Sequence, residues 1–168
     1  RLDGEQPVLL YYQGKRIEAL AVQYTMPENG PVGQAWAQGP GRFRADLPSE
    51  GHDAPRTITA TWNDELLLRP DGELHVLSLL GDAEIGDGQF GGLRAGQLHL
   101  WLKESQQDSN VDASSDIPPV LPDRLLAQEA VQLNSPALTG STQRFEVWFH
   151  HVPPEALANT EPKPAGPR

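Results

Sequence analysis

The stretch Leu93-Arg-Ala-Gly-Gln-Leu-His-Leu-Trp-Leu102 contains two short apolar alternations with glycine between them. Leu93 and Ala95 occupy odd positions, whereas Leu98 and Leu100 occupy even ones. Side chains of a strand alternate between faces, so a one-residue bulge at Gly96 would bring both pairs to one face. The stretch therefore predicts a strand that bends in its middle.

Two other stretches repeat this unit. Ile17-Glu-Ala19 precedes Val22-Gln-Tyr24, and Leu125-Leu-Ala127 precedes Val131-Gln-Leu133. Segments 16–24 and 123–133 also contain helix-forming residues, so helices are the competing interpretation. The repetition favours strands, and repeated short strands that cannot bury a face alone stack on a shared core, as in a sandwich, a jelly roll or a β-solenoid. We expect an all-β jelly roll or sandwich of short antiparallel strands.

Composition agrees with this fold class. Sixteen Gly and 16 Pro among 168 residues are too many for long helices, and the chain has no Cys. The net charge of −10 argues against a nucleic-acid partner, which requires a clustered basic surface. Leu66 to Leu77 reads as a hairpin, with Pro70-Asp71-Gly72 as its turn.

The expected organisation is a single domain. Residues 1–13 form an extension or a first edge strand, 14–149 form the β domain, and 150–168 form a Pro-rich tail or linker. Residues 105–122 are expected to be a mobile insertion loop, because few of them are apolar. Further breaks are expected at 46–55 and at the Gly-rich turn 86–92.

No catalytic motif is present, and we expect no enzyme activity, no cofactor and no metal site. Asp108 to Asp116 places oxygen donors at every second position, but Ala113 and Pro119 occupy the positions where a calcium loop needs Gly and Glu. The acidic group Asp82, Glu84 and Asp87 fits no calcium-loop spacing. The adjacent His150 and His151 would point to opposite faces of a strand, so they could not chelate from one side.

The four Trp residues are a richer feature. Packing in a core or an interface is the favoured interpretation, and stacking against sugar rings is the alternative. Trp101 and Trp148 occupy equivalent points of Leu98–Leu102 and Phe145–Phe149, and both oppose the parity of their apolar neighbours. One face of the sheet should therefore carry unusual residues for a solvated surface.

The repeated unit resembles the OstA-like domain of lipopolysaccharide transport, the LptA-type β-jellyroll. The resemblance spans about residues 14–149; it is carried by Leu93–Leu102 and Leu125–Phe149, with Leu79–Ile85 as a preceding strand. It implies a non-enzymatic lipid carrier or scaffold in the periplasm or cell envelope. The implied partners are lipopolysaccharide or another amphiphile, and similar domains paired through open edge strands.

The residues of matching parity are expected to line one apolar groove, with an ordinary filled core as the competing outcome. These groove residues are Val22, Tyr24, Leu98, Leu100, Leu102, Val131, Leu133, Phe145, Val147 and Phe149. The second functional hypothesis is a carbohydrate-binding or cell-surface structural module that uses Trp residues as sugar platforms.

Overall fold

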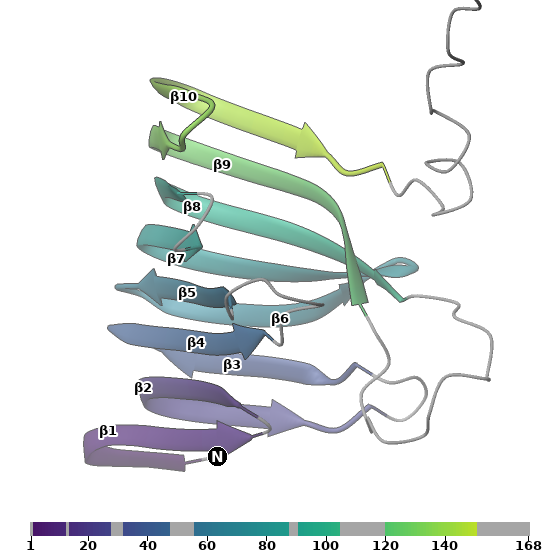
Figure 1. Cartoon of the computed structure of the whole chain (residues 1–168). Helices are drawn as coiled ribbons and strands as arrows, with labels where there is room; N and C mark the ends of the chain where they lie inside the picture. Colours follow the sequence, from purple (N-terminus) through teal and green to yellow (C-terminus); the bar gives the residue numbers. More distant parts are fainter. Residues whose placement is uncertain are drawn as a thin grey trace, which may run out of the picture.

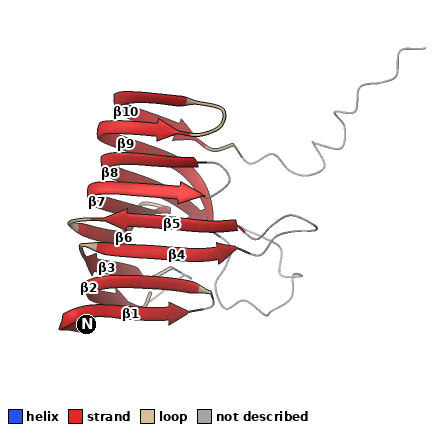
Figure 2. Cartoon of the chain, turned by 60° about the vertical axis from the view of Figure 1, so that its left-hand side comes forward, coloured by secondary structure: helices blue, strands red, loops and turns tan. Residues whose placement is uncertain are grey.

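The structure, a computed structural model, describes residues 2–12, 14–27, 32–47, 56–87, 91–104 and 120–150. These residues form ten antiparallel strands and no helix, which confirms the predicted all-β class (Figures 1 and 2). The strands are β1 (Leu2–Tyr12), β2 (Lys15–Thr25), β3 (Gln34–Gln38), β4 (Gly41–Leu47), β5 (Arg56–Trp62), β6 (Glu65–Asp71), β7 (Leu74–Asp87), β8 (Gly91–Glu104), β9 (Val120–Asn134) and β10 (Thr139–Trp148).

The ten strands form eight bent rungs that follow one another in chain order. Strands β1, β2, β7, β8, β9 and β10 are each one rung, whereas β3–β4 and β5–β6 are two rungs, each interrupted at its bend. Each rung pairs with the next, so the sheet is an antiparallel meander (Figure 1).

The bends divide the sheet into two halves, which we call arm A and arm B. Arm A contains β4, β5 and the parts of the longer strands that pair with them, and arm B contains β3, β6 and the corresponding other parts. One hydrophobic cluster includes residues of both arms, such as Ala60 and Leu93 from arm A and Leu66 and Leu98 from arm B. The arms therefore bury their inner faces against each other.

The bends coincide with register shifts, which we call corners. In β8 the register shifts between Arg94 and Gln97, so the predicted irregularity at Gly96 is confirmed. In β7 the corner contains Gly81, whose φ of 81° is unfavourable for a side chain, and an added Cβ would lie 2.5 Å from Asp64. Glycine thus permits both the bend and its close packing against the preceding rung.

The alternative helices are not formed. Segments 16–24 and 123–133 lie within β2 and β9, because cross-strand burial outweighs their moderate helix propensity. The hairpin is confirmed, with Asp71 opposite Leu74 and with Gly72 at a φ of 65°. Pro70 lies inside β6, however, so the turn begins after the predicted proline.

Two predicted boundaries were wrong. Residues 120–122 of the expected insertion belong to β9, where Val120 and Leu121 pair with Glu104 and Lys103. Backbone pairing with β8 orders these residues, although the polar stretch before them led to their assignment to the loop. Strand β10 ends at Trp148, so His150 follows the strand instead of lying in it.

Strand β1 forms one edge of the sheet, next to β2, and β10 forms the other edge, next to β9. The rest of the expected insertion (105–119), the centres of the breaks at 46–55 and 86–92, and the tail from residue 151 lie outside the described residues.

Candidate functional site

The inner face of arm B carries a row of apolar residues that are opposite one another in consecutive rungs. The row is Val22, Ala37, Leu66, Leu79, Leu98, Ala127 and Phe145. Phe145 is half-buried, and the other six are buried, with at most 7% of their surface exposed. Next to the corners, the space between the arms is therefore a filled core, and the expected groove residues Val22 and Leu98 belong to it.

A second row lies one pleat farther from the corners on the same face. It consists of Tyr24, Ala35, Leu68, Leu77, Leu100, Leu125 and Val147, which we call the outer row. Tyr24 is 55% exposed, and the others are half-buried. Apolar surface thus continues beyond the closed core toward solvent.

The remaining expected groove residues are distributed differently. Val131 and Leu133 lie on arm A, where Leu133 is opposite Leu93. Leu102 is opposite His75 at the far end of arm B. Phe149 lies beyond β10, is 37% exposed, and its backbone N–H donates to the Asp123 carbonyl. The structure thus distributes the ten residues over the two rows, the opposite arm, the far end of arm B and the end of β10.

Four members of the outer row were not among the expected groove residues: Ala35, Leu68, Leu77 and Leu125. Leu68 and Leu77 are directly opposite each other in the β6–β7 hairpin. In the sequence, Leu68 alternates with Leu66 and Leu77 alternates with Leu79, which indicates one apolar face of the hairpin. The sequence does not show that this face continues the row of Leu98 and Leu100, because that depends on the pairing of β7 with β8.

The facing arm A provides its own apolar row. This row is Leu10, Ile17, Phe43, Ala60, Ile85, Leu93 and Leu133. Its members belong to the core cluster or pack against it. This row spans the first seven rungs, and Phe145 of β10 packs against the same core from arm B, so all eight rungs contribute to the apolar interior.

The Trp residues separate into two groups. Trp62 is 1% exposed and belongs to the core, as the packing interpretation predicts. Trp36, Trp101 and Trp148 lie on the outer face of arm B, on the opposite pleat from its apolar rows. The outer face of arm B is thus the face on which the sequence predicted residues that are unusual for a solvated surface.

Polar partners hold two of the outer tryptophans. Trp36 Nε1 donates to Glu65 at 3.0 Å, and Trp101 Nε1 donates to Asp71 at 2.7 Å. The Arg124 guanidinium lies over the Trp101 ring, 3.8 Å from its centre, which is cation–π geometry. Trp148 is opposite Arg124 in register and is 57% exposed.

His99 lies on the same outer face. Its Nδ1 is 2.8 Å from the Ser78 hydroxyl, and Ser78 is only 3% exposed. Burial lowers the pKa of His99, and the positive charge of Arg69 adds to this effect. The imidazole is consequently held toward its neutral form.

Among the described residues, no group of three His, Asp or Glu side chains is placed to hold a metal ion. Asp82 instead pairs with Arg94, whose hydrogen bonds lower the pKa of the Asp82 carboxyl. The sequence 108–116, with its calcium-like spacing, lies outside the described residues, as do His52 and His151.

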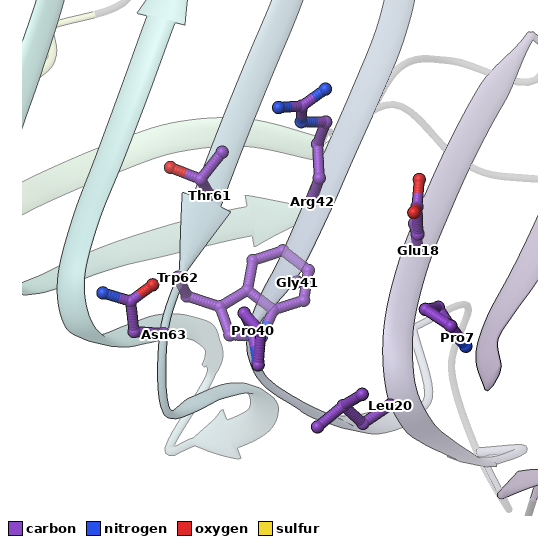
Figure 3. A pocket seen from close by; sticks show the side chains of 9 residues that line it. All are labelled: Pro7, Glu18, Leu20, Pro40, Gly41, Arg42, Thr61, Trp62 and Asn63. Atoms are coloured by element: carbon purple, nitrogen blue, oxygen red, sulfur yellow. The ribbon is translucent and has the colours of Figure 1, made fainter. Parts of the chain in front are cut away.

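A cavity of about 420 Å³ lies at the corners of the first four rungs (Figure 3). It is lined by Pro7, Glu18, Leu20, Pro40, Gly41, Arg42, Thr61, Trp62 and Asn63. Sequence reasoning did not identify this site, because its residues come from four separate rungs and share no motif.

Comparison with known proteins does not identify the chain: no family model, no curated protein and no solved structure matches it. In the described residues, no helix has the length and hydropathy needed to cross a membrane. Function is therefore inferred from the geometry of the two arms.

Proposed function

We propose that the chain is a non-enzymatic carrier of amphiphiles in the periplasm or cell envelope, similar to OstA-like lipopolysaccharide transport proteins. On this proposal the bent sheet is a jelly roll of the OstA-like type. The supporting observation is the outer row, in which six residues from Ala35 to Val147 are apolar and half-buried beside a closed core.

An acyl chain would lie along the outer row with its polar end in solvent. Each methylene that leaves water contributes about 0.8 kcal/mol, so contact with only a few methylenes gives measurable affinity. Leu77, Leu100 and Leu125 are in register in β7, β8 and β9, so an extended chain could cross these rungs without meeting a polar side chain.

The edge strands support the proposed pairing with similar domains. Within the described residues β1 pairs only with β2, and β10 pairs only with β9. An edge strand presents backbone donors and acceptors that another strand can pair with. Stacking through β1 or β10 would continue the apolar rows into the next domain.

Titration with a fluorescent fatty acid and with lipopolysaccharide tests the proposal. Leu100→Asp should weaken binding at least tenfold, because a carboxylate in the outer row would have to lose water against the acyl chain. Lys103→Gln changes the net charge by the same amount on the exposed side of β8 and should bind as the parent does.

Leu125→Ser provides a milder second variant if Leu100→Asp does not fold, which thermal unfolding would reveal. Negligible binding by the folded parent, or equal binding by the parent and both outer-row variants, would exclude carriage in the outer row.

The carbohydrate-binding module remains the second candidate. The observation that favours it is Trp148, an exposed indole beside Arg124 and Glu146, which approach each other to 3.7 Å. An exposed ring flanked by a donor and an acceptor can stack on a sugar. Loss of glycan binding on Trp148→Ala, with lipid binding retained, would favour this candidate.

A further inference from the structure

The cavity in Figure 3 lies where four consecutive rungs turn from one arm to the other. Leu20 is at the corner of β2, Pro40 lies between β3 and β4, and Asn63 lies between β5 and β6. Pro7 comes from the irregular part of β1, between the paired residues Asp3 and Val8. The site is therefore separate from the outer row.

The corners differ in how they are joined. Between the third and fourth rungs, the Gly39 N–H donates to the Asp64 carbonyl at 2.6 Å. Between the fourth and fifth, the Asn63 and Asp64 N–H groups donate to Gly81 and Leu80. Among the described residues, no such corner bond joins the second and third rungs.

The pairing of β2 explains this opening. It pairs with β4 up to Glu18 and with β3 from Ala21 onward, so Leu20 has no cross-strand partner in the third rung. Pro40 occupies the opposing corner and has no N–H to donate. The adjacent rungs separate there, and the cavity occupies the space.

Polar groups at the cavity have few protein partners. Trp62 Nε1 is buried and has no hydrogen-bond partner among the described residues, which is unfavourable for a buried donor. Arg42 is opposite Glu18 in register, yet the Glu18 carboxylate pairs with Arg16 at 3.1 Å. Arg42 forms no ion pair with a described residue.

Glycine at position 41 places the indole at this site. A Cβ on Gly41 would lie 2.2 Å from a ring carbon of Trp62 and 2.8 Å from its Nε1, so the missing side chain lets the ring lie against β4. The indole, which is 1% exposed, therefore lies directly beneath the cavity, and Leu20 and Pro40 form its accessible apolar wall (Figure 3).

We propose that this corner cavity binds a neutral sugar ring. A sugar hydroxyl both donates and accepts, which matches the donors Arg42 and Trp62, the acceptor Glu18, and the dual groups of Thr61 and Asn63. One cation and one carboxylate at the site favour a neutral ligand over an anion. The apolar wall suits the C–H face of the ring, and the volume is typical of small-molecule sites.

Because Nε1 is buried, binding must include a small tilt of the Trp62 indole, and this tilt gives the test its readout. The ¹H–¹⁵N signals of the four indole groups are followed while the ¹⁵N-labelled chain is titrated with glucose, galactose, mannose and N-acetylglucosamine. At least one sugar should shift the Trp62 signal, assigned from Trp62→Phe, with a dissociation constant in the millimolar range or below.

Arg42→Gln should weaken that binding at least tenfold, because it removes the unpaired cation from the wall. Arg69→Gln is the matched control: Arg69 is also exposed but lies on β6, away from the cavity, and its replacement should leave binding unchanged. Leu20→Trp should fill the cavity and abolish the shift without removing a polar group.

Three results would overturn the proposal: no indole shift with any of the four sugars, a shift confined to Trp148, or tighter binding of glucuronate than of glucose. The second result would place the sugar on the outer face of arm B. Fatty-acid titration of the same variants measures the outer row independently, so failure at one site is distinguishable from failure at the other.

Discussion

The outer faces of the two arms differ although both belong to one sheet. On the outer face of arm A, one line of residues opposite one another in consecutive rungs consists of Glu18, Arg42, Thr61, Glu84, Arg94 and Gln132. On the outer face of arm B, the corresponding line of residues consists of Gln23, Trp36, Leu67, Ser78, His99, Leu126 and Glu146. Arm A alternates apolar and polar faces, as expected for a half-solvated sheet, whereas arm B carries apolar side chains on both faces.

Burial shows the same difference. On the outer pleat of arm B, Val76 and Ser78 are 4% and 3% exposed, whereas Glu18, Arg42 and Arg94 on arm A are partly or largely exposed. Strand alternation therefore identifies the inner face in arm A but does not suffice in arm B. In arm B, burial is not confined to the inner face.

The largest expected effect compares the two faces of arm B. Leu79→Ala removes a side chain that is 1% exposed in the core and should lower the free energy of unfolding by about 2–5 kcal/mol. Leu67→Ala, on the half-buried outer face, should cost about half as much, since less of its surface leaves water. Urea unfolding of the two variants measures both values.

Equal losses for these two variants would mean that the outer face of arm B is packed as tightly as the core. A loss for Leu67→Ala no larger than that for Thr59→Ala, at a half-buried position on the outer side of arm A, would mean instead that the outer face of arm B contributes no more to stability than that of arm A.

A smaller effect concerns acid stability on arm B. Burial lowers the pKa of His99 in the folded state, so the unfolded chain binds the proton more readily. His99 therefore favours folding above its ordinary pKa of 6.5, and this contribution is lost as the pH falls below 6.5 through the lowered folded-state value. Urea midpoints between pH 7.5 and pH 5 should fall less steeply for His99→Gln than for the parent.

Parallel pH profiles for the parent and His99→Gln would show that the outer face of arm B does not bury this imidazole. A steeper fall for the variant would mean that folding raises the pKa of His99 instead of lowering it.

The smallest effect is expected on the outer side of arm A. Asp82 and Arg94 form a close ion pair, but both side chains are about half exposed and solvent screens their charges. Asp82→Asn also retains a residue that tolerates the φ of 49° at this corner. The melting temperature should change less than for Leu67→Ala, and less still in 0.5 M salt; a larger change would show that the pair fixes the corner.

Much of the fold was predictable from local patterns. The units around Ala19, Ala95 and Ala127 identified three bent strands, because a shift in parity within an apolar alternation has few structural solutions. The rungs β3–β4 and β5–β6 were not recognised as units, because at their bends, Gly39–Pro40 and Asn63–Asp64, the strand itself is interrupted. Residues 120–122 were assigned to a loop because the backbone bonds that order them leave no trace in composition.

The sequence by itself determined the all-β class, the bend at Gly96, the hairpin turn at Gly72 and the residues that face inward in β8. These are local consequences of side-chain parity and of glycine's access to positive φ. The tertiary structure alone decided which apolar residues fill the core and which lie half-buried in the outer row, because burial depends on the distance from the corners. It also decided the cavity beside Trp62, since that site requires the corners of four rungs to lie side by side, which no segment of the chain encodes alone.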